Sequence, residues 1–148
     1  MPQKKKTKQL PWDVIYFKAA DGSVPATDFL DGCPHKPEAE MLATLEAVRK
    51  APPPRFSGGG RWEAMHGKMT GYFEVRTQGP KREQFRLFCL LENADDEELR
   101  QRGLPRPAIA VITGMRKPFM TVFSDSDYAK VRVLGDLHKS TYPRSIAT

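Results

Sequence analysis

Arginine and glutamate side chains at alternating positions could form a site for chemistry on phosphate. Arg86 lies in the run FRLFCLL, where every other side chain is apolar, and Glu74 and Arg76 alternate with apolar residues in the run YFEVR. Because arginine stays charged and its planar fork can hold two phosphate oxygens, this pattern suits an anion site. A simpler structural interpretation is an ion pair between Arg86 and Glu74 on neighbouring strands, and the hairpin by itself favours that interpretation.

Further charged residues extend the candidate site. Glu63 precedes the hairpin, and Arg116 and Lys117 follow a continuous apolar run. If the strands pair in sequence order, these residues and the two arginines converge on the open face of one sheet, at one end. RNA can be cleaved there without a metal if a base deprotonates the ribose 2′-OH, cations stabilise the charge that grows on the phosphate, and an acid protonates the leaving 5′ oxygen.

The proton donor and the outer contacts to nucleic acid are less sharply defined. Candidate proton donors are His66, Tyr72 and Tyr128. Each of them is also explained by an ordinary structural role, although histidine titrates near neutral pH. Candidate nucleic-acid contacts at turns and strand edges are Lys68, Lys81 and Arg82, which could equally have no function.

The hairpin is the element that must position this chemistry. Residues 71–92 alternate in polarity on both sides of the turn from Gln78 to Arg82, which predicts two paired strands. Ahead of the hairpin, the patterns predict a strand over 12–17, a helix over 24–30 that ends at a left-handed Gly32, and a helix over 37–50 with Met41, Leu42, Leu45 and Val48 buried. After it, they predict a strand over 108–113 and a helix that begins at a capping box of Ser124 and Asp127 and buries Tyr128, Val131, Leu134 and Leu137.

This order of elements predicts an α+β fold. Antiparallel strands form a meander, and the helices pack on one face and leave the other face open. We expect a disordered basic tail over residues 1–10, a single domain over residues 11–138, and a flexible polar tail over residues 139–148.

The composition favours a polyanionic partner. The chain has 24 lysine and arginine residues against 18 aspartate and glutamate residues, a formal charge of +6, and its pI is about 9.4. Such a balance favours nucleic acid first and a membrane surface second. Five acidic residues gather between positions 92 and 98, so the remaining surface is more basic than the average.

Several other classes of protein are not expected. No apolar run approaches the roughly 18 residues of a membrane helix, and no apolar stretch follows the basic N-terminus, which argues against a secretory signal. Two distant cysteines and three histidines without i,i+4 spacing predict neither a disulfide framework nor a metal site. The glycines at 58–60 lack the following Lys-Ser/Thr of a P-loop. We therefore expect a cytoplasmic protein without a metal or cofactor.

Taken together, these motifs resemble the RelE/HigB superfamily of bacterial toxins, and in particular its phage-derived HigB branch. The resemblance rests on the order of elements, on Glu63, and on the runs EVR at 74–76 and FRLF at 85–88. The opening WDVIYFKAADGSVPATDFL and the two cations before Thr121 and Tyr128-Ala129 are also similar to that branch. The connection over 93–107 and the turn after Lys117 are longer than in the family.

The resemblance implies both a fold and an activity. The fold would be RelE-like, with a small antiparallel or mixed sheet, N-terminal helices on one face and a C-terminal helix. The protein would be the toxin of a type II toxin–antitoxin system, an mRNA interferase that enters the ribosomal A site, contacts ribosomal RNA and cuts mRNA by 2′-OH attack. A cognate antitoxin protein would neutralise it, and no membrane would be involved.

The family's site residues correspond to positions in this chain. Arg86 corresponds to the strand arginine that contacts the scissile phosphate, and Arg76 to the end of the family's E-x-R strand. Glu63 corresponds to the general base of the YoeB branch, and Arg116 and Lys117 to the basic pair after the last strand. With this pattern counted, Arg86 is better interpreted as functional, whereas Arg76 is also explained as a solvated strand end and Glu63 as a surface carboxylate.

Two other functions stay open. One is a non-catalytic nucleic-acid-binding regulator on the same scaffold, which would bind in a salt-sensitive manner and create no new RNA 5′ ends. The other is an interaction protein that uses the acidic segment 92–98 to meet a basic partner.

Overall fold

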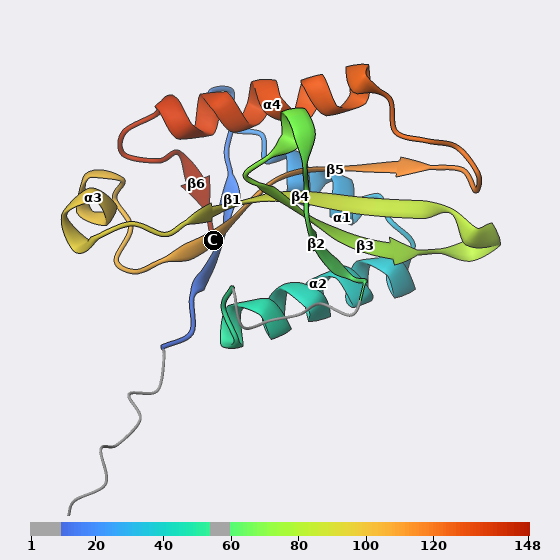
Figure 1. Ribbon diagram of the computed structural model, residues 1–148, viewed down its shortest axis with the longest axis horizontal. Helices are drawn as coiled ribbons and strands as arrows, with labels where there is room; N and C mark the ends of the chain where they lie inside the picture. The colour runs from blue at the N-terminus through green and yellow to red at the C-terminus, as the bar shows by residue number, and fades with distance from the viewer. Residues whose placement is uncertain (1–9, 54–59) are drawn as a thin grey trace, which may run out of the picture.

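The computed structural model of the protein describes residues 10–53 and 60–148, which form layers of helices around a sheet (Figure 1). The strands are β1 (Asp13–Phe17), β2 (Trp62–Ala64), β3 (Tyr72–Gln78), β4 (Gln84–Glu92), β5 (Ala108–Lys117) and β6 (Ile146–Ala147). The helices are α1 (Pro25–Asp31), α2 (His35–Lys50), α3 (Asp96–Gln101) and α4 (Asp125–Ser140), and the short 3-10 turns η1 (Gly67–Met69) and η2 (Pro80–Arg82) flank β3. The predicted α+β class is confirmed.

In the part of the chain that the structure describes, the six strands form one mixed sheet in the order β2-β3-β4-β5-β1-β6. β1 runs parallel to β5, and the other neighbouring strands are antiparallel. The predicted meander holds from β3 through β4 to β5. The predicted meander does not include the parallel pair, although the resemblance allowed a mixed sheet. The pair arises because α1 and α2 carry the chain away from β1 before β5 returns beside it (Figure 1).

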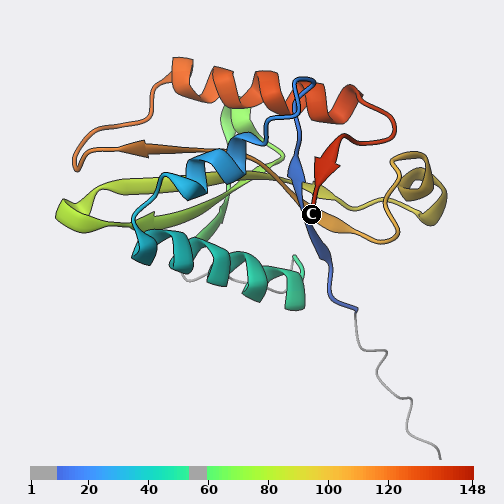
Figure 2. The ribbon, with the colours of Figure 1, turned by 180° about the vertical axis from the view of Figure 1, so that it is seen from behind.

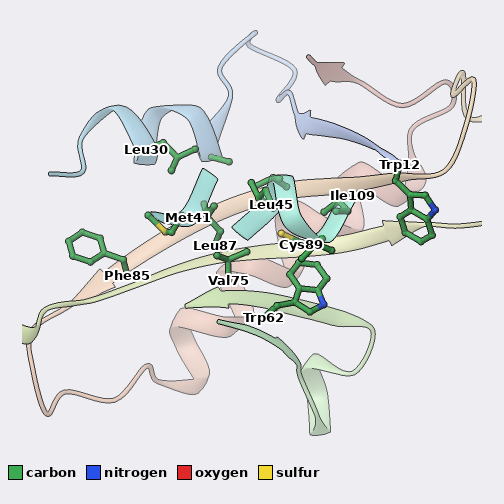
Figure 3. Close-up of a cluster of buried hydrophobic side chains, with 13 residues drawn as sticks. Trp12, Leu30, Met41, Leu45, Trp62, Val75, Phe85, Leu87, Cys89 and Ile109 are labelled. Carbon is green, nitrogen blue, oxygen red and sulfur yellow. The ribbon is translucent and has the colours of Figure 1, made fainter. Parts of the chain in front are cut away.

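The first face of the sheet packs against α1 and α2. Met41 and Leu45 of α2 meet Val75, Leu87 and other inward side chains of the central strands (Figure 3). The predicted stripe of α2 is right at three of its four positions, whereas Leu42 is exposed and Thr44 is buried in its place. The apolar side chains that alternate along the two strands, Val75 of β3 and Phe85, Leu87 and Cys89 of β4, therefore lie in this core, as predicted.

The second face of the sheet is covered by α4, so the prediction of an open face is wrong. Val131 of α4 is buried in a second apolar cluster, and Tyr128 and Leu134 pack against that cluster, which includes Phe88 and Ile112 of the sheet. Both ribbon views place α4 and α2 on opposite sides of the sheet (Figures 1 and 2). The predicted capping box is confirmed, because Ser124 and Asp127 exchange side-chain to backbone hydrogen bonds at the start of α4.

Two local predictions are corrected. Gly32 ends α1 with φ −87° and not in a left-handed conformation, because its N–H still bonds to the last helical carbonyls. The tail predicted over residues 139–148 is not a free end: α4 runs to Ser140, β6 pairs with β1, and the Arg144 guanidinium is buried against Glu92.

Residues 1–9 and 54–59 lie outside the described part, and with them most of the predicted basic tail and of the glycine-rich loop. No described helix has the length and apolar character needed to cross a membrane.

Candidate functional site

The hairpin of β3 and β4 sets two arginines directly opposite each other. Arg76 pairs with Arg86 in the β3–β4 register, and Glu74 lies two residues before Arg76 on the same face. The Glu74 carboxylate is shared, with Oε1 3.6 Å from Arg76 Nε and Oε2 3.8 Å from Arg86 Nε. Like charges directly opposite on a sheet repel each other, and one carboxylate balances only one of the two guanidinium charges. The predicted Arg86–Glu74 ion pair is thus present, but because Arg76 shares the same carboxylate, one guanidinium charge of the pair of arginines is not balanced by it.

Arg86 is held rigidly inside this face. It is only 7% exposed, donates from Nη1 to the Phe85 carbonyl at 3.0 Å, and donates from Nη2 to Gln84 Oε1 at 3.1 Å. Its guanidinium also lies 5.6 Å from the ring centre of Phe123. Burial, and next the charge of Arg76, lower the pKa of Arg86 below its usual value. An arginine remains charged even so, and several of its five N–H donors are still available to a ligand.

Two carboxylates lie side by side next to the arginines. Glu63 of β2 is paired directly with Glu74 of β3. Burial raises the pKa of Glu74, the charges of Arg86 and Arg76 oppose that change, and Glu63 reinforces it. Glu63 is exposed, so it can meet a ligand from solvent. The two groups differ in environment, and such pairs are suited to different roles in proton transfer.

An open cleft of about 570 Å³ lies between this edge of the sheet and the start of α4. Its lining includes five of the residues proposed from the sequence, namely Glu63, His66, Lys68, Arg76 and Tyr128. Glu74, Asp125 and Arg132 add charged groups to the same wall. Burial raises the pKa of Tyr128, and the charge of Glu74 adds to that effect.

Arg86 does not line this main cleft but opens into two smaller hollows beside it. The first, of about 260 Å³, is lined by Arg76, Arg86 and neighbouring residues of β3. The second, of about 350 Å³, extends from the same two arginines to the loop between β5 and α4. Arg76 borders all three spaces, so it stands between the main cleft and Arg86.

Arg116 and Lys117, predicted to follow the strand, form the end of β5, and their predicted convergence on the site is wrong for Arg116. Its guanidinium forms a two-point ion pair with Glu83, at 2.6 and 2.7 Å, and donates to the Gly32 carbonyl. It lies over the ring of Phe85, whose side chain belongs to the core under α1 and α2. The two residues of the pair point to opposite faces because they are adjacent in one strand. Lys117 lies on the α4 face but is paired with Asp127 at 3.1 Å.

The other proposed residues divide between the cleft and the interior. His66 lies in the cleft wall, whereas the Tyr72 hydroxyl is buried against α4 beside Gly135 and is without a hydrogen-bond partner in the described residues. Burial raises the pKa of Tyr72 to about 12. Tyr72 is therefore part of the packing between sheet and helix and is not placed to donate a proton in the cleft. Lys81 and Arg82 lie in the η2 turn, where the guanidinium of Arg82 covers the ring of Phe119 at 5.2 Å.

Reasoning from the sequence missed three residues of this site. Glu74 was read only as the partner of Arg86, although its place in the polar face of β3 already put it between both arginines. Gln84 carries no charge that would single it out, and it joins Arg86 to the loop after β5. Phe123 lies in the loop between β5 and α4, outside any regular pattern, and only the fold brings its ring to Arg86.

As an arrangement, the site offers fixed cations, carboxylates in two environments, and an open approach from solvent. This set can bind an anion such as a phosphodiester and move a proton beside it. Within residues 10–53 and 60–148, no group of three or more histidine, cysteine or acidic side chains is placed to hold a metal ion.

Comparison with family models gives no match to the chain, and neither the curated proteins nor the solved structures searched contain a significant match.

Proposed function

We propose that the protein is an endoribonuclease of the RelE/HigB toxin type, which cleaves mRNA on the ribosome by metal-free attack of the 2′-OH. The observation that carries the proposal is the pair of opposed arginines, Arg76 and Arg86, which share the single carboxylate of Glu74 beside an open cleft. A site with an uncompensated guanidinium charge and free N–H donors is suited to a phosphate group.

In the proposed mechanism, each group at the site has a distinct task. Arg86 and Arg76 hold the scissile phosphate and stabilise the charge that develops on it. Glu63 takes the proton from the 2′-OH, whose oxygen attacks phosphorus to form a 2′,3′-cyclic phosphate while the bond to the 5′ oxygen breaks. A second group protonates that leaving oxygen, and His66 and Tyr128 are the proposed donors that line the cleft.

The partners follow from the same proposal. The substrate is mRNA in the ribosomal A site. The proposed contacts to RNA are Lys68 in the cleft wall and Lys81 and Arg82 in the η2 turn. The formal charge of +6 supports a polyanionic partner. The proposal includes a cytoplasmic location and a cognate antitoxin protein that blocks the site.

A second function is favoured by the state of Arg86. Its side chain is largely buried and two of its donors are already used within the protein. A regulator that binds nucleic acid without cutting it would need only the charge at this position. Such a protein would bind RNA or DNA with strong salt dependence and leave the strands intact.

The decisive experiment is induced expression in a bacterial host with genome-wide mapping of mRNA 5′ ends. Wild type is expected to stop growth and to create cuts in register with codons. Arg86→Ala and Arg76→Ala are expected to remove the cuts, and Arg76 is the safer position because its side chain is 42% exposed. Arg106→Ala is the matched control, because that arginine lies on the surface in an ion pair with Asp13.

The outcomes separate the two functions. The nuclease is supported if wild type and the control produce cuts in register with codons and the two site variants produce none. Thermal melting must show that all four proteins are folded. Absence of cuts with folded wild type rejects the nuclease and leaves the regulator. Undiminished cutting by a folded Arg86→Ala variant contradicts the role given to this arginine.

A further inference from the structure

The loop between β5 and α4 exposes an apolar tip next to the arginine pair. Phe119 is 46% exposed, Met120 is 84% exposed and Val122 is 86% exposed. These three side chains, here called the loop tip, line the hollow of about 350 Å³ that Arg76 and Arg86 also line. Exposure of neighbouring apolar side chains to water is unfavourable, and such exposed apolar patches commonly mark a binding site.

The loop tip is fixed to the arginine site by one side chain. Gln84 Nε2 donates to the Thr121 carbonyl at 2.7 Å and to the Pro118 carbonyl at 3.3 Å, while Gln84 Oε1 accepts from Arg86 Nη2. Met120, at the centre of the loop, has a positive φ of 65°, which is unfavourable for a residue with a side chain. The protein thus holds a strained, apolar turn in a fixed position relative to Arg86.

Cations and aromatic rings alternate across this surface. The Arg82 guanidinium lies over the ring of Phe119, and the Arg86 guanidinium lies near the ring of Phe123. Proteins that bind single-stranded nucleic acid combine such elements, because the cations follow the phosphates and the rings stack on the bases. An apolar protein segment would gain little from the uncompensated charge beside the tip, whereas a polyanion with flat apolar bases matches both features.

We propose that the loop tip is a subsite for an unpaired nucleobase of RNA, adjacent to the phosphate held by Arg76 and Arg86. This inference rests on the proposed function and adds to it the class of substrate: a single-stranded ribonucleotide segment, bound through one phosphate and one neighbouring base. Gln84 is a positioning residue that keeps the two subsites in register.

The test measures binding of a short single-stranded oligoribonucleotide at low salt by fluorescence anisotropy. 2′-O-methyl groups at every position block the attacking hydroxyl and prevent cutting. A matching series lacks one base at a time while keeping every phosphate. Because stacking on an aromatic side chain contributes about 1–3 kcal/mol per base, Phe119→Ala is expected to weaken binding of the intact strand about tenfold. Val122→Ser, at a position that is 86% exposed, is expected to leave the fold unchanged and to weaken binding in the same direction.

Two signatures identify a base subsite. The loss caused by Phe119→Ala is expected to disappear with the strand that lacks the neighbouring base, because nothing then stacks there. The salt dependence of binding is expected to stay as in wild type for Phe119→Ala and to become shallower for Arg86→Ala, since only the latter removes a phosphate contact. Val133→Ala, an exposed apolar residue on the outer side of α4, is the control and is expected to bind like wild type.

The result that overturns the inference is equal binding of the intact strand by wild type, Phe119→Ala and Val122→Ser, or a loss that persists with every base-deleted strand. The loop tip would then be a docking surface for protein. Failure of the nuclease proposal is recognised separately. If Phe119→Ala weakens binding only when the neighbouring base is present, but no cuts form in cells, the base subsite is supported and the proposed nuclease activity is rejected. A wild-type protein that does not bind the strand at all rejects the subsite.

Discussion

At the scale of single residues, the site is governed by an imbalance of charge. Two guanidinium groups face each other across β3 and β4, and Glu74 lies within 4 Å of both through a weak, shared ion pair. A phosphate that enters must compete with this carboxylate for the same donors. Burial also raises the pKa of Glu74, so its negative charge can be lost on acidification.

We predict that Glu74→Gln increases affinity for a non-cleavable oligoribonucleotide at neutral pH. Removing a charge that opposes phosphate is expected to contribute about 1 kcal/mol, or about fivefold in affinity. Because the pKa of Glu74 is raised, lowering the pH protonates the wild-type carboxyl, and the difference between the two proteins is expected to shrink as the pH falls towards the usual range of a carboxyl group. Anisotropy titrations at several pH values measure this.

The control for this prediction is Glu46→Gln, which removes the same charge from the exposed side of α2, where Glu46 pairs with Arg49 and Lys50. It is expected to leave affinity nearly unchanged. Weaker binding by Glu74→Gln at all pH values would mean that the carboxylate orients the arginines and does not compete with the ligand.

At the scale of elements, the sequence predicts a helix or strand well where a local pattern determines it. It predicts poorly where the structure depends on a partner far along the chain. The β3–β4 hairpin and the capping box of α4 were predicted because alternation and capping are local properties. The parallel pairing of β1 with β5 and the two-residue β6 were not, because each depends on a partner far along the chain. For the candidate site, the charged positions could be chosen from the sequence. The β4–β5 register, which pairs Arg116 with Phe85 and so places it on the face opposite to Arg86, could not.

The covering of the second sheet face has a specific cause. All helices were expected on the opposite face of the sheet. On the second face, the polar residues of β3 and β4 occupy only one end. The other end carries Phe88 and Tyr72, and α4 packs there through Val131 and a glycine, Gly135, that lets the helix approach Tyr72 closely. A glycine within a helix reads as a weakness from propensity alone, and its packing role is visible only in the fold.

We predict that Gly135→Ala lowers the free energy of unfolding by about 1–3 kcal/mol, because the new methyl group would overlap the Tyr72 hydroxyl. Tyr72→Phe alone is expected to be neutral or stabilising by up to about 1 kcal/mol, since that hydroxyl is buried and has no partner in the described residues. In the double variant the cost of the alanine is expected to fall, which urea unfolding of all four proteins would show as a positive coupling. Additive effects would mean that the helix and the ring do not limit each other.

At the scale of the whole molecule, one buried charged cluster joins segments that lie far apart in sequence. Glu92 at the end of β4 accepts from Arg144 Nε at 2.9 Å and lies 3.6 Å from Arg102 Nη1. Arg144 also donates to the carbonyls of Lys139 and Thr141, which fixes the chain between α4 and β6. The cluster lies at the end of the sheet away from the arginine pair, so it stabilises the fold without entering the candidate site.

His138 of α4 makes this cluster sensitive to pH. Its ring is fully buried, its two nitrogens have no hydrogen-bond partner in the described residues, and its edge meets the ring of Phe17. Burial lowers the pKa of His138 from the usual 6.5 to about 4; the charge of Glu92 opposes this change, whereas the cations around it, first Arg144, reinforce it. At neutral pH the folded and unfolded forms both carry a neutral ring, so the histidine then has no effect on the pH dependence of stability.

We predict that the protein loses stability as the pH falls through the window between about 6.5 and 4. In this window the unfolded chain binds a proton at His138 and the folded protein does not, so acidification favours the unfolded state, by about 3 kcal/mol over the whole window. Urea unfolding at neutral pH and at about pH 5 measures the effect, and His138→Gln is expected to flatten this part of the pH dependence. His66→Gln, which changes an exposed histidine in the cleft wall, is expected to leave it as in wild type. If His138→Gln and wild type lose stability equally on acidification, the buried histidine is not the source of the pH dependence in this window, and the role given to it here is contradicted.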